Sequence, residues 1–579
     1  MEPLSTELIA PNAKTRLVVV RLALVCATLV ACASAYSAHL TSFLHAKEYA
    51  LAIGVAALGM LTLMNGRVSR VGVSFLIPLL ALVIVAVSAG LAGFTTLNRA
   101  AAIELLRWSV LALFVLNVFD ILAAERGRRV VCAGIIASAV AVSALALAQF
   151  AGLVPVLFPV YEGHAHPLYS VFGNPGLMGG YVALGLPIAF HFASGKTGAR
   201  FVWMASIVPI CAGLAISGTR SAWAAALAGV LFVLAYERLW NRYAAATLLL
   251  VLLAVAALVL IAPDQTIGRF ESAALGGDSS SSLRFWFWSG AIELIREFPV
   301  FGVGPGNFAY HSPEALAHVL HGPGGVQFAH NEVHTLHAHN DFLELAAETG
   351  AVGLLLILWW CLRLVRCPGP EWGSLIAYAV FAAFYFPTFS SPHALVALIL
   401  AAVLFARRHD AEAKPAGRAA ASLVGLISMA VLGLVVWMVL IPSFEYREAL
   451  DRHLAKDDPI PAYERLAAHP WAPTGVHEKL GLALLQAGQN EAAETEFKNA
   501  LISIDTGAVY LGLGVALFQQ GKLDEAREAF ESCVYRWPSH AYAWELLLRV
   551  TPQEDRGKVL ERATTWLSRE DIERIDKLE

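Results

Sequence analysis

The chain has 579 residues, of which 58 % are hydrophobic and only 15 % are charged. Soluble domains average about 25 % charged residues, so most of this chain is too apolar to face water. The formal net charge of −4 excludes a bulk electrostatic attraction to nucleic acid. These values indicate a polytopic membrane protein with a soluble part attached, and no nucleic-acid partner.

The cysteines give no sign of a disulfide framework. Six of the seven lie in or beside apolar runs, and Cys533 stands alone near the C-terminus. Lys14 and Arg16 precede the first apolar run, and no cleavable signal peptide is evident. We therefore expect this first run to stay in the mature chain as a membrane anchor.

Apolar runs of about 20 residues can cross a bilayer as helices. The sequence predicts about 13 of them, at residues 17–36, 49–64, 71–94, 101–122, 130–153, 176–193, 201–217, 221–237, 243–262, 342–362, 373–388, 391–406 and 419–441. The expected fold is all-α: a polytopic bundle of membrane helices, followed by a soluble helical domain.

The loops between these segments differ in basic charge. With a cytoplasmic N-terminus, alternate loops carry clusters of Arg and Lys, at 67–70, 126–129, 196–200, 238–242, 363–366 and 407–418, whereas 154–175 and 386–393 carry none. Cytoplasmic loops of membrane proteins are enriched in Lys and Arg. The pattern therefore places the loop 263–341 and the C-terminal region on the outer face.

Residues 334–353 combine titratable side chains with the start of an apolar run. His337, His339 and Asn340 come first, and Glu348 follows shortly before the run that begins at residue 351. Ionisable groups at the entrance to a membrane helix cost free energy and are functional candidates, and histidine exchanges protons near neutral pH. A single histidine here can serve only as a hydrogen-bonding group, but the close spacing of several favours a functional cluster.

Two outer loops are long or rich in turn residues. The first, 154–175, ends in Phe-Gly-Asn-Pro at 172–175, which predicts a turn before a helix. The second, 263–341, is too long for a passive connection. Its aromatic helix at 284–298 either lies at the membrane interface or packs on the membrane domain. Its glycine-rich segment at 301–308 either presents N–H groups to a phosphate or forms only a tight turn.

Two arginines on the expected outer side are candidate phosphate ligands. Arg220 lies in a short polar break, Ser-Gly-Thr-Arg-Ser at 217–221, between two apolar runs. Arginine can bind a phosphate through two parallel hydrogen bonds. An arginine at a membrane boundary can instead extend its side chain to the interface without binding a ligand. Arg99, at the outer turn between the third and fourth predicted membrane helices, is the second candidate.

The region after residue 441 is richer in charge and contains an internal repeat. Residues 480–489 (LGLALLQAGQ) align with 513–522 (LGVALFQQGK), and Ala493 and Phe497 match Ala526 and Phe530 at the same offset of 33. This pattern resembles a tetratricopeptide array of two repeats, with degenerate helices at 459–468 and 541–567 as caps. We therefore divide the chain into a membrane domain, 1–442, and a repeat domain, 443–579, which would bind a protein partner or pack on its own chain.

One spacing in the outer region is similar to a known signature. His339-Asn340, nine residues, Gly350, two residues and Gly353 resemble the motif of the bacterial O-antigen ligase and polymerase superfamily. The segments at 172–175 and 217–221, and the stretch from Arg284 to residues 306–308, agree with this resemblance, which covers roughly residues 20–405.

The resemblance implies a GT-C-like polytopic fold and a polyprenyl-diphosphate-linked glycan as donor, transferred on the outer face of the inner membrane. The acceptor would be lipid A-core, another lipid-linked repeat unit or a protein. The essential histidine falls on His339 and the arginine that grips the diphosphate on Arg220. Ala224 replaces the leucine that usually follows the ligase arginine by four residues, and the best-known ligases have no repeat tail. Ligase, polymerase and protein O-glycosyltransferase therefore stay open.

The expected chemistry needs a base and a cation. Arg220 would neutralise the leaving diphosphate, with Arg284 as a second cation. His339 would take the proton of the acceptor hydroxyl, unless it stays protonated and binds phosphate instead. His337 or Glu348 would orient His339.

Three further residues complete the expected substrate site. They are Asn340, Asn174 and Arg99. We expect Asn340 to cap the following helix rather than to touch substrate, because asparagine is a favoured N-cap.

A zinc site, a lipid-glycan transporter and a pure binding protein are the alternatives to a transferase. The histidines at 311, 318, 321, 330 and 334 invite a zinc site, but no cysteine and few acids share their spacing, so we expect neither a metal nor another cofactor. A lipid-glycan transporter would be expected to show inverted repeats and ionisable residues at mid-membrane depth. A pure binding protein would not need Arg220 and His339 together, so a metal-independent enzyme is favoured.

Overall fold

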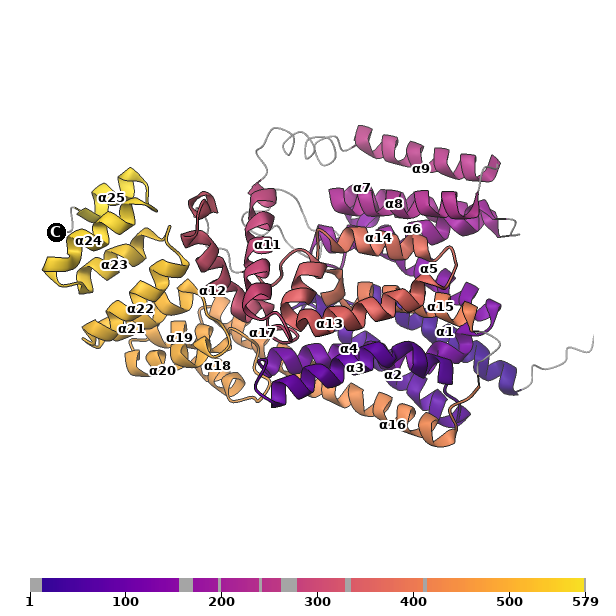
Figure 1. The fold of residues 1–579 in the computed structure, drawn as a ribbon, viewed down its shortest axis with the longest axis horizontal. Coiled ribbons are helices and arrows are strands. Elements are labelled where there is room, and N and C mark those ends of the chain that lie inside the picture. Colours follow the sequence, from indigo (N-terminus) through magenta and orange to yellow (C-terminus); the bar gives the residue numbers. More distant parts are fainter. Residues whose placement is uncertain are drawn as a thin grey trace, which may run out of the picture.

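The computed structural model describes residues 13–155, 170–195, 199–238, 242–261, 279–328, 335–409 and 414–576. Regular structure in these ranges is helical, apart from an isolated bridge between Ser69 and Pro415. Long helices run side by side in the larger part, and shorter helices form a smaller group at one end (Figure 1). The predicted all-α bundle with an attached helical domain is therefore confirmed.

Each predicted membrane segment coincides with a helix. The helices are α1 (Ala13–Ser34), α2 (Phe43–Asn65), α3 (Arg70–Leu91), α4 (Arg99–Leu122), α5 (Glu125–Phe150), α6 (Pro175–Ser194), α7 (Arg200–Ser217), α8 (Arg220–Glu237), α9 (Arg242–Ile261), α13 (Asp341–Val365), α14 (Trp372–Ala382), α15 (Ser391–Arg408) and α16 (Arg418–Val435). Within the described residues, 11 helices are long and apolar enough to cross a membrane. α14 has only 11 residues. The chain is thus a polytopic membrane protein, and the number of about 13 spans stays a prediction.

Glycines allow the membrane helices to approach one another closely. A Cβ on Gly59 of α2 would lie 2.4 Å from the Ser428 side chain of α16, and one on Gly180 of α6 would lie 2.1 Å from the Phe381 ring of α14. Helix α14 also packs on α8. Membrane helices associate through such close packing of small residues, because lipid offers little hydrophobic driving force between them.

Helix α13 is interrupted at Gly350, which has φ 59° and ψ −164°. A Cβ at this position would lie 2.4 Å from the carbonyl oxygen of Val300. The loop after α11 supplies hydrogen-bond partners for the backbone groups at this interruption. The N–H of Val303 donates to the Ala347 carbonyl (2.9 Å), and the N–H of Val352 donates to the Val300 carbonyl (3.1 Å). Only glycine fits this left-handed position against a neighbouring backbone, which explains the first glycine of the His-Asn motif physically.

Two helices of the long loop 263–341 run across the direction of the membrane helices (Figure 1). They are α11 (Ser279–Glu297) and α12 (Phe308–His321). Trp286 of α11 packs on α12, where its Nε1–H donates to the Leu316 carbonyl (3.1 Å), whereas Phe285 is 59 % exposed. Of the two interpretations of this aromatic helix, packing within the protein therefore holds for Trp286.

The last membrane helix continues without a break into the repeat region. α16 passes through a π-helical turn, Val436–Leu440, into α17 (Ile441–Leu454). The predicted domain boundary at 442–443 therefore falls inside a helix. A helical connection holds the two parts more rigidly than a flexible linker would.

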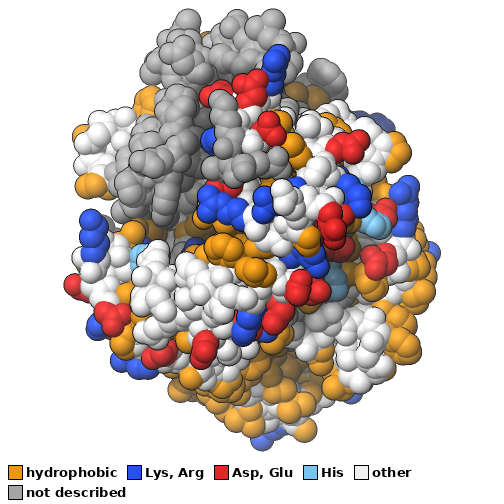
Figure 2. Space-filling model, turned by 90° about the vertical axis from the view of Figure 1, so that its left-hand side faces the viewer, with side chains coloured by type: hydrophobic (Ala, Val, Ile, Leu, Met, Phe, Trp, Pro, Cys, Tyr) orange, Lys and Arg blue, Asp and Glu red, His pale blue; other side chains and the backbone are white. Residues whose placement is uncertain are grey.

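The repeat region is a stack of helices. It comprises α18 (Ile460–Ala467), α19 (Val476–Gln486), α20 (Asn490–Leu501), α21 (Gly507–Gln519), α22 (Leu523–Arg536), α23 (Ala541–Val550), α24 (Gln553–Thr564) and α25 (Arg569–Asp576). A Cβ on Gly481 would lie 3.1 Å from the Phe497 ring, and one on Gly514 would lie 2.5 Å from the Phe530 ring. The repeated glycine and phenylalanine thus perform the same packing in both repeats. At this end of the molecule, acidic and basic side chains are interspersed (Figure 2).

The repeat region docks on α12 of the loop 263–341. Arg536 of α22 donates to Asp505 (2.8 Å) and also to Glu314 of α12. His321 of α12 stacks on Tyr535, with 4.6 Å between ring centroids and parallel planes. Because α12 packs on α11, the repeats lie one helix away from the helix that carries Arg284.

Candidate functional site

His339 occupies a tight loop directly before α13. Its backbone has φ 53°, a left-handed conformation that a residue with a side chain rarely adopts. The imidazole stacks on Phe287 of α11 (5.8 Å between centroids, 24°) and meets Phe386 edge-on (5.1 Å, 89°). Its Nδ1 is buried and has no hydrogen-bond partner among the described residues. Backbone strain and unsatisfied buried polar atoms both concentrate at functional sites.

The carboxylate of Glu344 holds the chain just before His339. Its Oε1 lies 2.7 Å from Nδ1 of His337, and its Oε2 accepts from the N–H of Ala338 at 2.8 Å. These two contacts fix the positions of His337 and Ala338. Glu344 was not predicted as a site residue, although a carboxylate in the first turn of a helix that begins with a polar cap is a signal visible in the sequence.

The loop 385–389 fixes the other side of the histidine loop. Oδ2 of Asp341 accepts from both the N–H and the hydroxyl of Thr388 (2.8 and 2.6 Å), and the N–H of Asp341 donates to the Tyr385 carbonyl (3.2 Å). The side chain of Asn340 caps α13 by accepting from two backbone N–H groups of the first turn (3.0 and 3.2 Å). Its expected capping role is confirmed, and its oxygen is occupied by that role.

Arg284 shares a face of α11 with two aromatic residues, Phe287 and Trp288, because residues three and four apart on a helix are neighbours. Phe287 stacks on His339, and the Nε1–H of Trp288 donates to the His339 carbonyl at 3.5 Å. The positive charge of Arg284 acts on the His339 imidazole. The structure therefore brings Arg284 and His339 together.

Both imidazoles of the loop are neutral at neutral pH. Burial lowers the pKa of His339 to about 4, and the positive charge of Arg284 acts in the same direction. Burial also lowers the pKa of His337 to about 3, with a further contribution from the guanidinium of Arg107. The unprotonated form of His339 has a lone pair free to accept a proton.

Asn174 connects the start of α6 to the His339 environment. Its Oδ1 accepts from the N–H of Gly176 (2.8 Å) and from the hydroxyl of Tyr385 (3.0 Å). The Tyr385 ring in turn meets His339 edge-on at 5.7 Å. A Cβ on Gly176 would overlap the Tyr385 hydroxyl at 1.8 Å, so glycine is required for this approach.

Arg220 is the first residue of α8, and the segment around it packs against the start of α6. Gly179 of α6 makes room for Ser217 and Ala222, which flank Arg220: a Cβ there would lie 2.5 Å from the Ser217 hydroxyl and 3.1 Å from Ala222. Gly176 and Gly179 are separated by about 4.5 Å along the helix axis. The first turn of α6 therefore touches the Arg220 segment and, through Tyr385, the ring beside His339.

Glu348 and the glycine-rich turn serve the backbone instead of the imidazole. Oε1 of Glu348 accepts from the N–H of Phe308 at 3.2 Å. The N–H groups of Val303 and Gly304 donate to carbonyls of the interrupted helix α13 (2.9 and 3.0 Å). These N–H groups are not available to a phosphate, so the tight-turn interpretation holds. Among the described residues, Nδ1 of His339 has no hydrogen-bond partner, so neither Glu348 nor His337 bonds to this atom. That His337 or Glu348 orients His339 stays a prediction.

Arg99 joins the membrane and repeat parts. It opens α4, and its Nε–H donates to the carbonyl of Trp471 at 2.9 Å, in the segment that precedes α19. The Trp471 ring meets Trp437 of the last membrane helix at 5.6 Å. Arg99 therefore has a structural contact at the junction, and no contact in the described residues links it to His339.

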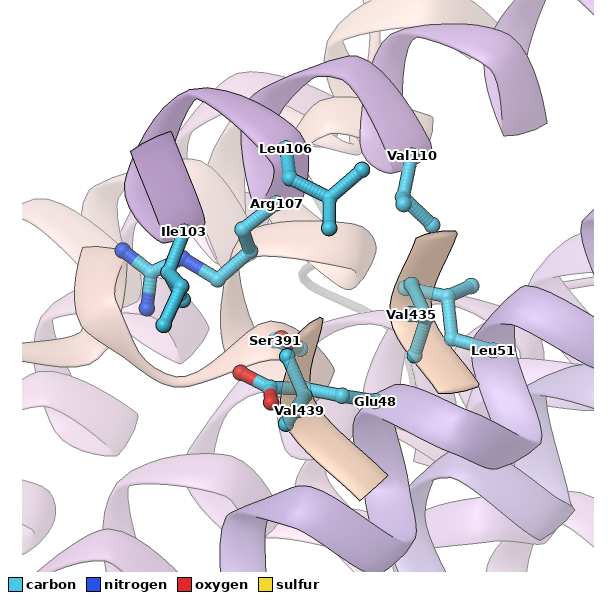
Figure 3. A pocket seen from close by; sticks show the side chains of 9 residues that line it. All are labelled: Glu48, Leu51, Ile103, Leu106, Arg107, Val110, Ser391, Val435 and Val439. Carbon is cyan, nitrogen blue, oxygen red and sulfur yellow. The ribbon is translucent and has the colours of Figure 1, made fainter. Parts of the chain in front are cut away.

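Arg107 and Glu104 of α4 form a buried ion pair that contacts the loop 385–389. Neither residue was predicted from the sequence as part of the site. Arg107 of α4 donates to the Glu104 carboxylate and to the Phe389 carbonyl, and the Phe389 ring packs on His337 at 4.9 Å. Arg107 and Glu48 point into a small cavity of about 20 Å³, enough for a single water (Figure 3). The ion pair thus supports the loop on which the imidazoles rest.

The histidines considered for a metal site are spread over the outer region. His318 lies 3.5 Å from Glu293, whereas His311 contacts Thr96 at 3.3 Å. His330 and His334 lie outside the described residues. In the part of the chain that the structure describes, no three His, Cys, Asp or Glu side chains come together as a metal site.

Residues 204–358 match the family model described as O-Antigen ligase. This part of the chain is similar to O-antigen ligases. The matched range includes Arg220, Arg284, His337, His339 and Glu348, so the resemblance drawn from the sequence is confirmed there. Proteins with this domain are glycosyltransferase-like ligases and polymerases. Residues 478–548 match a Tetratricopeptide repeat model, which confirms the internal repeat. A search of curated proteins with this chain finds no match.

Proposed function

We propose that this protein is a glycosyltransferase that moves a glycan from a polyprenyl-diphosphate-linked donor to an acceptor hydroxyl. The transfer takes place on the outer face of the bacterial inner membrane, where the basic-loop pattern places His339 and the repeat domain. The observation that carries the proposal is the partly buried imidazole of His339, which stacks on Phe287 of the helix that carries Arg284. Burial and the charge of Arg284 both lower its pKa, which favours the neutral ring. A base and a cation are the two groups that this transfer needs.

The two arginines hold the diphosphate of the donor. The diphosphate is a good leaving group, and the protein must mainly position it and neutralise its developing charge. Arg220 does this from the start of α8, where the helix N-terminus adds a partial positive charge. Arg284 approaches from α11, on the side of the His339 ring. Asn174 and Tyr385 lie between these elements and limit how the donor can enter.

His339 acts as general base in a direct displacement. The acceptor oxygen forms a bond to the anomeric carbon while the bond from that carbon to the diphosphate oxygen breaks. The proton of the acceptor hydroxyl moves to the imidazole, and the polyprenyl diphosphate leaves with the electron pair. A single displacement of this kind inverts the anomeric centre.

The pKa of His339 favours the base over a protonated phosphate ligand. With a pKa of about 4, the ring is neutral before the donor binds. The negative charge of a bound diphosphate offsets the charge of Arg284 and raises the pKa of His339. Donor binding therefore makes the imidazole a stronger base when the acceptor arrives.

The acceptor distinguishes three forms of the proposal. A ligase transfers to lipid A-core, a polymerase to another lipid-linked repeat unit, and a protein O-oligosaccharyltransferase to a protein. A lipid-glycan transporter is the alternative that involves no chemistry. The repeats on the same face suit a protein partner.

Glycan analysis in cells tests the proposal. Wild type, His339→Ala and Arg220→Ala are compared, with His318→Ala as a matched control because His318 is 66 % exposed and pairs with Glu293 of α11 at 3.5 Å. With equal amounts in the membrane, the first two variants should accumulate lipid-linked glycan and lose the product, and the control should not. The product lost then identifies the acceptor. Unchanged glycans in both variants would contradict the transferase and favour transport.

A further inference from the structure

A cleft of about 520 Å³ opens at the end of the bundle away from the repeats. Helix α4 begins beside Trp471 of the repeat region, and the cleft lies at its other end, around Asp120. The first turns of α1, the α2–α3 turn, the α4–α5 turn and Pro415 line it. The cleft therefore lies at a membrane boundary and far along the bundle from His339.

The cleft carries a surplus of positive charge. Arg21, which is only 2 % exposed, donates to both oxygens of Asp120 (2.7 and 2.8 Å), and its Nε has no partner among the described residues. Arg67 and Arg126 also line the cleft and are exposed. Asp120 is the single carboxylate among the residues that line it, so the charge of two guanidinium groups is left without a counter-ion within the cleft.

One wall of the cleft is apolar and continuous with the surface that lipid would contact. Val18 and Val19 of α1 line the cleft and are 45 % and 51 % exposed, and Val20 beside them is 52 % exposed. Exposed aliphatic side chains on a membrane helix face hydrocarbon at no cost in free energy. The cleft thus combines a cationic rim with an apolar flank, as a phospholipid does with its phosphate and acyl chains.

We propose that this cleft binds an anionic phospholipid. Its phosphate lies between Arg67 and Arg126, which can each donate two parallel hydrogen bonds, and its acyl chains follow Val18 and Val19. Basic pockets between membrane helices at the cytoplasmic side suit such headgroups, because that leaflet is rich in anionic lipid. The volume falls within the range of about 300–1,000 Å³ typical of small-molecule sites. This site is independent of the proposed transfer reaction.

Native mass spectrometry of the full-length protein tests the site. The protein is extracted in mild detergent and equilibrated with phosphatidylglycerol or phosphatidylethanolamine, and bound lipids are counted. Arg67→Gln with Arg126→Gln should reduce retained phosphatidylglycerol at least fivefold, whereas phosphatidylethanolamine is retained weakly in all forms. The matched control is Arg129→Gln, since Arg129 lies on the same helix α5, is 63 % exposed and pairs with Glu125 at 2.5 Å.

Three results would overturn the proposal. One is equal retention of phosphatidylglycerol by wild type and the double variant, with melting temperatures showing that both are folded. The second is an equal loss in Arg129→Gln, which would indicate a diffuse surface charge effect. The third is displacement of the lipid by millimolar inorganic phosphate, which would indicate a site for the free anion.

Discussion

Oε1 of Glu344 forms a 2.7 Å hydrogen bond with Nδ1 of His337, and its Oε2 accepts from the Ala338 N–H at 2.8 Å. One buried carboxylate therefore fixes both residues that precede His339. The left-handed backbone of His339, with φ 53°, costs free energy and persists only when neighbouring contacts hold it. Glu344 supplies these contacts, so it acts as a positioning residue for the proposed base.

Glu344→Gln should slow transfer without weakening donor binding. Glutamine has one acceptor oxygen in place of two, and a buried polar partner left unsatisfied costs about 1–3 kcal/mol. If most of this is lost in placing His339, single-turnover transfer falls roughly tenfold. The control is Glu371→Gln, because Glu371 is equally buried but bonds to Arg407 instead. Similar transfer rates in the two variants at similar melting temperatures would contradict the positioning role.

Arg284→Gln should shift the acid limb of the pH profile upward. Transfer needs neutral His339, so in wild type kcat/KM is constant at neutral pH and falls as pH drops through the pKa of about 4. Arg284 is one of the groups that lower this pKa, so its neutralisation raises the pKa and the fall begins at a higher pH. Arg296→Gln, on the same helix and paired with Glu293 at 3.5 Å, should leave the limb in place. Activity that declines as pH rises through neutrality would instead indicate a protonated His339.

Gly350→Ala should destabilise the protein and abolish transfer. The new Cβ would lie 2.4 Å from the Val300 carbonyl, at a φ of 59°, and strain at such positions costs about 1–3 kcal/mol before the clash is included. Gly433→Ala in α16 is the control, because no atom lies within 4 Å of its Cβ position. Melting temperature and activity in detergent measure both effects. An active, stable Gly350→Ala variant would show that the interrupted helix is not required.

Arg536→Ala should loosen the repeat region from α12. Arg536 donates to Asp505 at 2.8 Å and to Glu314, and its side chain is only 12 % exposed. Loss of these charged contacts leaves two carboxylates unpaired, at a cost of about 1–3 kcal/mol. Limited proteolysis should cut faster in the segment 455–475. Arg549→Ala, whose partner Glu545 lies on the same helix, should be cut at the wild-type rate; equal rates for all three proteins would refute the docking role.

The sequence was sufficient to predict the helices and the repeats. Apolar runs fix the membrane helices, and the matching glycine and phenylalanine at an offset of 33 indicate repeated helix pairs. Asn340 could be predicted as a cap because capping depends only on neighbouring residues. That His339 and Arg284 belong to one site was suggested by the resemblance of the His-Asn motif to a known family. Hydrophobic periodicity and charge alone did not indicate it.

The partners of the loop could not be predicted from local sequence. The Glu344 contact depends on a left-handed turn at His339, and the Tyr385 and Thr388 contacts depend on how α14 returns the chain to α13. Glu348 carries the same chemistry as Glu344, but one further turn of helix directs it to Phe308. Arg107 and Glu104 lie inside an apolar run, where nothing in the neighbouring sequence marks them as partners of a distant loop.

The measurement that tests the central claim most directly separates donor binding from chemistry. Purified wild type, His339→Ala and Arg220→Gln are titrated with lipid-linked donor, and single-turnover transfer is then followed at saturating donor. Loss of a general base typically slows the chemical step by about 10²–10⁴-fold. The account predicts that His339→Ala binds donor as wild type does but slows transfer to this extent, whereas Arg220→Gln loses donor affinity. If His339→Ala loses donor affinity in proportion to its rate, His339 is a phosphate ligand and not the base.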